Sequence, residues 1–509
     1  MVRVGQPFFG ALALGVIALM AASGGCGGGK GGSGFDDSTS SSGGDGQDSS
    51  VSSGGSSSGF SVTGTDADLG SGSSGAAPAC SNGTTGWRCQ VDTSCSTSSP
   101  TTLTGKVFDP AGANPLYDVV VFIPNVVASL PVITPGTHTC NTCDVSIGDY
   151  VVATQTDATG SFTLQGVPTG TNVPVTVQIG KWRRTTYVDI TKSCGTTTVS
   201  AGTLRLPANH MEGDMPQMAV LTGGCDDLGC FLTNIGIDPT EFSAPNKGGR
   251  LDVYSGVGGA SLSSGTAGAC ATNTCPLWSS KKAFEYYDIV MLSCECGEQT
   301  NTNESTAAYT NLHDWLNEGG KVFASHYHYT WFKDNPDAAW QAVATWLGSS
   351  IAAGSGKYDL NTTFPKGMEF DQWLNNVGAL AANGTPPTIN LSFVASSVST
   401  INTKTATQWI YDPSTSPNDT KYLSFETPIG GIVGADSGPE GTPQYCGKAV
   451  FTDLHTGGSL FSTVNSIPSG CTKAALSPQQ KALEFLFFDL SACVTSDTII
   501  PPPPPPVPQ

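Results

Sequence analysis

The stretch LHDWLNEGGKVFASHYH, residues 312–328, contains the change from helix to strand that decides the fold of this 509-residue chain. Apolar residues at helical spacing in Ala307–Asn317 predict an amphipathic helix, and Gly319 and Gly320 mark its end. The next residues, Lys321–Ser325, form an apolar run that is typical of a strand buried on both faces of a parallel sheet. A helix followed by such a strand predicts an α/β domain around this stretch.

Segments on both sides of this stretch repeat the pattern. Apolar runs predict four further buried strands, and amphipathic segments predict helices at Asp226–Ile235 and Pro478–Leu490. The predicted strands are Met218–Thr222, Leu251–Tyr254, Tyr287–Ser293 (YDIVMLS) and Ala449–Thr452. We therefore expect residues 207–495 to form an α/β domain with a mainly parallel, flavodoxin-like sheet. Residues 348–443, which are rich in Gly, Thr and Pro, are expected to be an insertion with some antiparallel strand.

Three of the six histidines directly follow predicted strands. His326 and His328 come after KVFAS, and His455 comes after AVFTDL. Open α/β sheets bind ligands outside the carboxyl ends of their strands, so this position favours a functional site. Because residues i and i+2 of an extended segment face the same side, His326 and His328 are expected to point together. Asp453 and the segment Cys294-Glu295-Cys296, which ends a neighbouring predicted strand, are expected nearby.

Two kinds of chemistry fit these residues. His326, His328 and His455 could bind a divalent metal such as zinc, and no other cofactor is expected. Alternatively, the histidines and Asp453 could act as general acid and base around a sugar or a similar polar substrate. The side chains expected to bind such a ligand are Tyr327, Tyr329, Trp331 and Glu295. A third interpretation involves no chemistry, with the histidines bonded to backbone groups.

The region before this domain has a different pattern. Within residues 79–206, short β-branched runs alternate with Gly, Pro and Asn turns, and no helical period is present. The tetrapeptides Asp109–Gly112 and Asp157–Gly160 each place Gly where a tight turn needs positive φ. This spacing predicts a small antiparallel β-sandwich.

The N-terminus is typical of an exported protein. Residues 1–25 contain a basic start, an apolar stretch too short to span a bilayer, and a small-residue exit, which together predict a cleaved signal. The exit resembles a bacterial lipobox, so Cys26 is expected to be acylated and to hold the protein to a membrane, with the outer membrane or cell surface as its location. Ser23 departs from the usual lipobox residue, and simple secretion is the alternative. Residues 26–78 are expected to be a disordered Gly/Ser tether, and residues 496–509 a Pro-rich tail.

Cysteine usage agrees with an oxidising compartment. Sixteen cysteines after a secretion signal indicate disulfides. The six between Cys80 and Cys194 could form three bridges among themselves, and a disulfide is favoured over a metal or redox role for the C-x-x-C of Cys140 and Cys143. The nine that remain in the second half are an odd number, so we expect one free thiol there. One of Cys294 and Cys296 is expected to pair with Cys270 or Cys275.

The charge balance excludes one class of partner. The formal net charge is −19 and the pI is about 4.5, whereas nucleic-acid binding needs a basic face. No apolar run after the signal is long enough for a transmembrane helix. No oligomeric state follows from the sequence.

Two family resemblances extend these expectations. GKVFDPAGANPLYDVVVFIPN and TDATGSFTLQGVPTG, within residues 105–170, resemble the carboxypeptidase regulatory-like domain, a transthyretin-like sandwich. The insert at Thr137–Asp144 departs from that family. The resemblance covers about a fifth of the chain and implies a non-catalytic accessory module.

YDIVMLS, LHDWLNEGGKVFASHYH and GKAVFTDLH resemble the class I glutamine-amidotransferase-like fold and its ThuA-like branch. The amidotransferase pattern Gly-x-Cys-x-Gly is absent around Cys294 and Cys296, so glutaminase chemistry is not expected. Together the features favour a non-catalytic cell-surface lipoprotein that binds carbohydrate or another envelope polymer. The alternative is an exported sugar-active hydrolase or metal-dependent enzyme that uses the histidines of the α/β domain.

Overall fold

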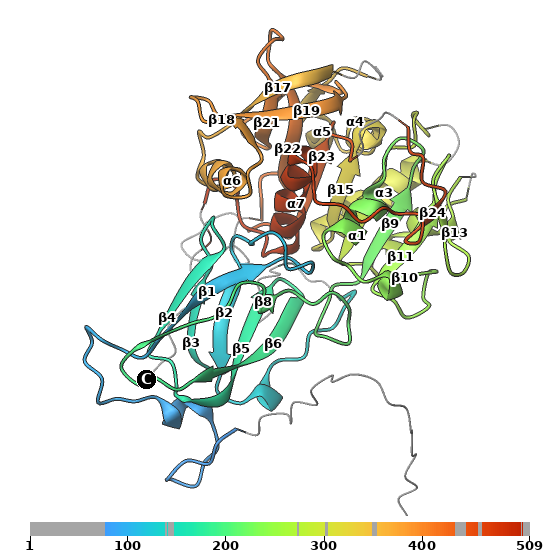
Figure 1. Ribbon diagram of the computed structural model, residues 1–509. Helices are drawn as coiled ribbons and strands as arrows, with labels where there is room; N and C mark the ends of the chain where they lie inside the picture. Colours follow the sequence, from blue (N-terminus) through green and yellow to red (C-terminus); the bar gives the residue numbers. More distant parts are fainter. Residues whose placement is uncertain are drawn as a thin grey trace, which may run out of the picture. The chain divides into compact units, whose positions relative to one another are not determined.

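The parallel half of a large sheet forms around residues 312–328. In the computed structural model, six parallel strands lie in the order β10-β11-β9-β14-β15-β23 (Figure 1). Their bounds are Phe242–Ser243 (β10), Leu251–Ser255 (β11), Met218–Thr222 (β9), Ile289–Leu292 (β14), Lys321–Ser325 (β15) and Gly447–Thr452 (β23). Every residue of β9, β14, β15 and β23 is buried, as expected for strands covered on both faces.

The structure describes residues 77–137, 140, 147–271, 274–300, 304–348, 354–432, 444–456, 461–499 and 501. The predicted signal, Cys26, the tether and most of the Pro-rich tail lie outside these residues. Within them, no helix is both long and apolar enough to cross a bilayer.

Beyond β23 the same sheet becomes antiparallel. Strand β22 runs antiparallel to β23, and the order continues β21-β17-β19-β18. The strands of this half are Gly354–Leu360 (β17), Leu380–Ala382 (β18), Thr388–Val394 (β19), Thr407–Asp412 (β21) and Asp419–Thr427 (β22), with the side strands Ala344–Trp346 (β16) and Val398–Ile401 (β20). A further side strand, Gly268–Ala269 (β13), pairs in parallel with β11 in the parallel half. The sheet is therefore mixed, with a parallel core, and less uniformly parallel than expected, because the insertion extends the sheet.

Helices connect and cover the strands. They are Leu228–Asn234 (α1), Lys281–Phe284 (α2), Thr306–Asn317 (α3), Thr330–Lys333 (α4), Ala338–Gln341 (α5), Pro365–Asn376 (α6) and Pro478–Ser491 (α7). The N-cap side chain of Ser305 accepts a hydrogen bond from Ala308 N at the start of α3, and Ser477 with Gln480 forms a capping box at α7. Helix α7 contacts β15, β19 and β23, so it covers the sheet where the parallel and antiparallel halves meet.

The N-terminal region contains two small sheets. One has the antiparallel order β3-β2-β5-β6 and the other has β4-β1-β7, with β8 also beside β1. The strands are Thr102–Phe108 (β1), Val120–Pro124 (β2), Tyr150–Gln155 (β3), Ser161–Gln165 (β4), Gly170–Ile179 (β5), Trp182–Ile190 (β6), Thr196–Thr198 (β7) and Leu204–Arg205 (β8). Strand β1 pairs in parallel with β7 and β8, so this region is not wholly antiparallel as predicted. A further short pair joins Ser261–Leu262 (β12) to Ser466–Ile467 (β24).

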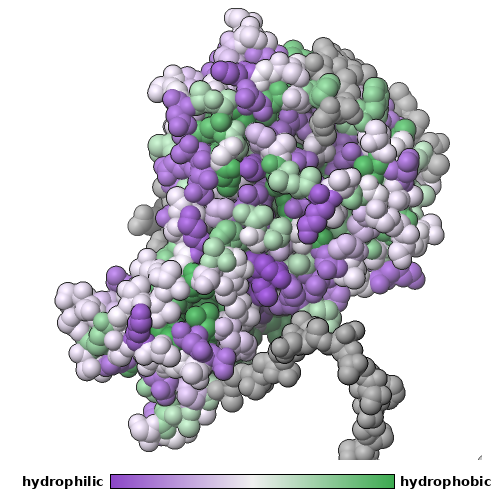
Figure 2. All heavy atoms as spheres, viewed as in Figure 1, coloured by the Kyte–Doolittle hydropathy of each residue, from purple (hydrophilic) through white to green (hydrophobic). Residues whose placement is uncertain are grey.

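One apolar core runs from the small sheets into the large one. Trp182 of β6 is fully buried and contacts Phe487 and Phe488 of α7 edge-on, at centroid distances of 6.5 and 6.1 Å. Such aromatic pairs contribute beyond the area that they bury. Figure 2 shows apolar residues in small scattered groups among polar ones on the face viewed.

Six disulfides cross-link the described residues. They join Cys80–Cys89, Cys95–Cys194, Cys140–Cys446, Cys225–Cys296, Cys230–Cys471 and Cys270–Cys275. Two expectations fail. Cys140 pairs with a cysteine of the second half, and Cys296 pairs with Cys225 instead of Cys270 or Cys275. The predicted free thiol of the second half is matched by Cys294, which is in no disulfide. Cys143 lies outside the described residues.

Candidate functional site

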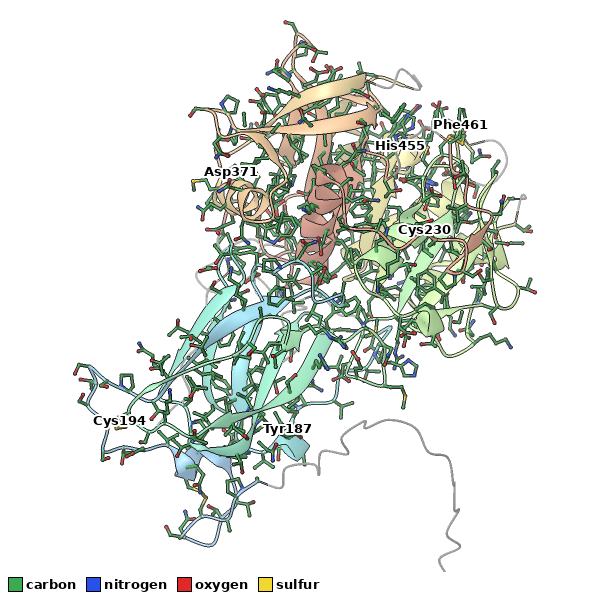
Figure 3. The ribbon with its side chains drawn as sticks, in the orientation of Figure 1. Tyr187, Cys194, Cys230, Asp371, His455 and Phe461 are labelled. Atoms are coloured by element: carbon green, nitrogen blue, oxygen red, sulfur yellow. A yellow bond between two sulfur atoms is a disulfide. The ribbon has the colours of Figure 1, made fainter. Side chains whose placement is uncertain are left out.

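Three side chains meet at the carboxyl edge of the parallel strands. Cys294 follows β14, His326 follows β15 and His455 follows β23, and these strands are neighbours in the sheet (His455 is labelled in Figure 3). Adjacent parallel strands end at the same edge, so residues just beyond their ends converge. The structure thus brings together two of the three predicted histidines with Cys294, whose segment was expected nearby.

The three side chains are close enough to share one ion. One potential ligand atom from each of Cys294, His326 and His455 lies within 4.8 Å of the other two. The Cys294 Sγ is 3.4 Å from His326 Nδ1, and the two imidazole centroids are 5.1 Å apart with the rings nearly perpendicular. The exposed fractions of the three residues are 0%, 2% and 0%. The group is therefore a compact, buried set of nitrogen and sulfur atoms.

The rings are held in defined orientations. His455 Nδ1 lies 2.8 Å from the carbonyl oxygen of Phe393, which can only accept, so this nitrogen carries the proton and Nε2 carries the lone pair. Among the described residues, neither His455 Nε2 nor His326 Nε2 has a hydrogen-bond partner. Buried polar atoms are nearly always paired, so two unpaired nitrogens in one cluster require an explanation.

Burial keeps the thiol and one imidazole uncharged at neutral pH. Burial, with the nearby imidazoles of His455 and His328, lowers the pKa of His326 to about 3. Burial likewise raises the pKa of Cys294 to about 12. A cysteine nucleophile needs a thiolate stabilised by a cationic neighbour. Cys294 and His326 do not form such a pair as they stand.

His328 does not join the cluster, because the backbone differs from the expected one. His326–Tyr329 form a 3-10 turn, η6, and not an extended segment. Successive side chains of such a turn are about 120° apart, so residues i and i+2 diverge. His326 itself has a left-handed φ of 42°. The prediction that His326 and His328 point together is therefore wrong.

His328 lies instead in a buried ionic group. Its Nε2 is 2.8 Å from Ser293 O, its Nδ1 is 3.5 Å from a Glu304 oxygen, and Trp331 Nε1 is 3.1 Å from the same Nδ1. Burial opposes the charged imidazolium, yet the carboxylates of Glu304 and Glu295 outweigh burial and raise the pKa of His328. Although Glu295, Glu304 and His328 are close enough to hold an ion, both ring nitrogens are occupied by protein groups. This group is structural.

Asp453 is buried beside His455 without entering the cluster. Its Oδ2 accepts a hydrogen bond of 2.7 Å from Ser397 N, and burial raises its pKa. The carboxylate therefore holds the segment that contains Ser397 and Phe393, which in turn positions the His455 ring.

The aromatic residues predicted to bind a ligand are core residues. Tyr329 and Trp331 are fully buried, and Tyr327 is 6% exposed. Trp331 packs edge-on against Trp278 at a centroid distance of 5.2 Å. Tyr329 stacks on Trp346 at 6.1 Å. Their ring faces are covered by other rings, which argues against a role as stacking surfaces for a sugar.

Asp226 was not among the predicted site residues, yet its carboxylate connects the segments around the site. It accepts hydrogen bonds from Ser325 Oγ at 2.6 Å, Thr456 N at 2.8 Å, Thr456 Oγ1 at 2.6 Å and Asp227 N at 2.9 Å. These donors follow or end three different strands, β15, β23 and β9. The only sequence signal was the position of Asp226 after a predicted strand.

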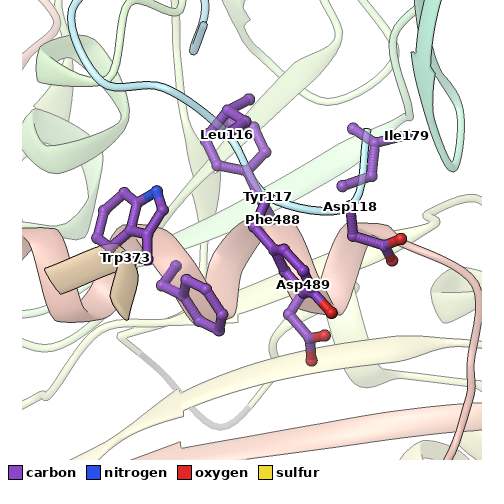
Figure 4. Close-up of a pocket in the computed structure, with 8 residues that line it drawn as sticks. Leu116, Tyr117, Asp118, Ile179, Trp373, Phe488 and Asp489 are labelled. Atoms are coloured by element: carbon purple, nitrogen blue, oxygen red, sulfur yellow. The ribbon is translucent and has the colours of Figure 1, made fainter. Parts of the chain in front are cut away.

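A separate hollow lies between the N-terminal region and helix α7 (Figure 4). It is mostly apolar and shares no residue with the cluster of Cys294, His326 and His455. Its lining residues are Leu116, Tyr117, Asp118, Ile179, Trp373, Phe485, Phe488 and Asp489. Of its two carboxylates, that of Asp489 is bound by Lys366 and Lys448.

No protein-family model, curated protein or solved structure matches this chain. The functional interpretation therefore rests on the residues and their geometry.

Proposed function

We propose that this protein is an extracytoplasmic lipoprotein, anchored through acylated Cys26, that binds carbohydrate or another envelope polymer without catalysing a reaction. The observation that carries the non-catalytic part is the burial of the candidate catalytic side chains. His326, His455 and Asp453 are 2%, 0% and 0% exposed. A general acid or base must come within hydrogen-bond reach of its substrate, and a buried side chain does not offer that access to a polymer.

The location is supported by the cross-links. Six disulfides are typical of proteins that fold in an oxidising compartment. The polymer ligand is supported by the resemblance of residues 105–170 to an accessory sandwich module. We also propose that the large domain has a flavodoxin-like fold, because the strands in one half of its sheet run parallel.

The test uses the purified mature chain and isolated cell-wall material. We expect the protein to sediment with insoluble envelope polysaccharide or peptidoglycan and to release no soluble reducing sugar. Release of sugar that is lost in His455→Ala would contradict the proposal and favour an exported hydrolase.

The lipid anchor is tested separately. Cys26→Ser is expected to move the protein from the membrane fraction to the soluble fraction; a variant that stays membrane-bound would contradict lipidation.

A second candidate function is favoured by one observation. Cys294, His326 and His455 converge within 4.8 Å and are residue types that suit zinc or copper, which favours a metal-dependent enzyme as the alternative. Loss of sugar release on chelation, with recovery on adding metal, would identify that alternative.

A further inference from the structure

We propose that Cys294, His326 and His455 together bind one thiophilic transition-metal ion, of the zinc or copper type, at the carboxyl edge of the sheet. This inference goes beyond polymer binding and does not depend on it. It rests on four observations: the spacing of the ligand atoms, the unpaired Nε2 of His455, the chemistry of the donor set and the rigidity of the surroundings.

The spacing matches a shared ion. With metal–sulfur and metal–nitrogen bonds of about 2.3 Å and 2.0–2.1 Å, a tetrahedral angle separates the two ligand atoms by about 3.5 Å. The Cys294 Sγ and His326 Nδ1 are 3.4 Å apart. All three ligand atoms fall within 4.8 Å of one another, so a single ion can contact each of them after small side-chain rotations.

The unpaired Nε2 of His455 supports a metal at this place. His455 donates through Nδ1 to Phe393 O, which leaves the lone pair of Nε2 with no partner among the described residues. A carbonyl that fixes the tautomer of a histidine in this way is the usual support of a metal ligand. Without an ion, the lone pair would lose its hydrogen bond to water on folding and gain nothing in exchange.

The donor set selects the class of metal. Two imidazoles and one thiolate suit zinc and copper, whereas magnesium and calcium require oxygen ligands. Binding replaces the thiol proton by the metal, so one proton leaves for each ion bound. Three protein ligands leave one coordination position for a water molecule or an external ligand.

The surroundings hold the ligands in place before the ion arrives. The disulfide Cys225–Cys296 lies two residues from Cys294, and Cys225 N donates to Cys294 O at 3.0 Å. Asp226 links the residue before His326 to the residue after His455 through its bonds to Ser325 and Thr456. The backbone of all three ligands is thus anchored by neighbouring groups.

The experiment uses the full mature protein, stripped with a chelator and titrated with Co²⁺ as a spectroscopic probe for zinc sites. We expect one equivalent to bind, with a thiolate-to-cobalt charge-transfer band, and Zn²⁺ to displace it. Cys294→Ser should abolish that band, and His326→Ala or His455→Ala should weaken binding at least about tenfold. His210→Ala is the matched control, because His210 lies 37% exposed beside Glu241, outside the cluster, and it should bind as the wild type does.

Wild-type protein with a titratable reduced thiol that binds no stoichiometric Co²⁺ or Zn²⁺ would overturn the proposal. Binding that persists unchanged in folded Cys294→Ser would do the same. If a variant fails to fold, the alkylation rate of wild-type Cys294 is measured during partial denaturation with and without one equivalent of Zn²⁺. Slower alkylation with Zn²⁺ supports the site, and equal rates contradict it. Polymer sedimentation, measured with and without metal, separates this result from that of the proposed function.

Discussion

One left-handed residue decides which imidazoles meet at the end of the sheet. The φ of 42° at His326 begins a 3-10 turn directly after β15, and this turn directs His326 toward Cys294 and His328 toward Glu304. The sequence predicted that His326 and His455 follow strands, and the structure places them together. The segment that contains Cys294 was expected nearby, but Cys294 was not predicted as a third ligand, because the contact between its thiol and His326 depends on the turn geometry after β15.

The close contact between Gly320 and Trp315 gives a testable prediction about stability. A Cβ at Gly320 would lie 2.3 Å from the indole of Trp315, which is fully buried. Gly320→Ala is therefore expected to lower the free energy of unfolding by about 1–3 kcal/mol through overpacking. Gly356→Ala is the matched control, since a Cβ at Gly356 meets no atom within 4 Å. Equal stabilities of the two variants in denaturant titrations would contradict the proposed contact.

At the scale of elements, apolar runs in the sequence predicted the positions of strands and helices, whereas polar segments did not. The predicted strand Lys321–Ser325 is observed with the same bounds, and the helix Ala307–Asn317 begins one residue earlier. Burial on both faces leaves a clear apolar signal in such strands. The antiparallel half of the sheet was only partly foreseen, because its strands mix polar and apolar residues and pair with partners distant in sequence. The short strands β7 and β8 left no signal for their parallel pairing.

The junction between β1 and helix α7 predicts a pH dependence. Burial raises the pKa of Asp109 to about 6, and burial together with Asp109 raises the pKa of Glu484 well above its usual range. Asn114 Nδ2 donates to Glu484 Oε2 at 2.7 Å. Carboxyl groups whose pKa is raised by folding stabilise the protein when protonated, so this contribution is present below about pH 4 and is lost as the pH rises through about 6.

Glu484→Gln should therefore reduce the loss of stability between pH 4 and pH 7, because the neutral amide cannot ionise. Unfolding free energies measured at several pH values would test this difference. Glu285→Gln serves as a control, because Glu285 belongs to an exposed ion pair with Lys281 that contributes little. A Glu484→Gln profile parallel to that of the wild type would be inconsistent with protonation of the buried pair.

At the scale of the whole molecule, the cross-links determine how the chain is held together. Cys230–Cys471 closes a separation of 241 residues and Cys140–Cys446 one of 306. Sequence could predict that disulfides form, from composition and the export signal. It could not predict their partners, because pairing depends on which distant segments the sheet brings together.

Loop length gives a prediction for these bridges. Removing Cys230–Cys471 by a double Cys→Ser substitution should cost about 4–5 kcal/mol, and removing Cys80–Cys89, with a separation of only 9 residues, about 2–3 kcal/mol. Chemical denaturation of both double variants under oxidising conditions measures the difference. A larger loss from the shorter bridge would show that loop closure is not the main source of the stabilisation.

X-ray absorption spectroscopy on the wild-type mature protein, loaded with one equivalent of zinc, tests the proposed metal site without any substitution. The predicted spectrum has one sulfur ligand at about 2.3 Å and two imidazole nitrogens at about 2.0–2.1 Å. Such a spectrum would establish that the ends of β14, β15 and β23 hold Cys294, His326 and His455 around one ion. A first shell of oxygen and nitrogen without sulfur would contradict the site.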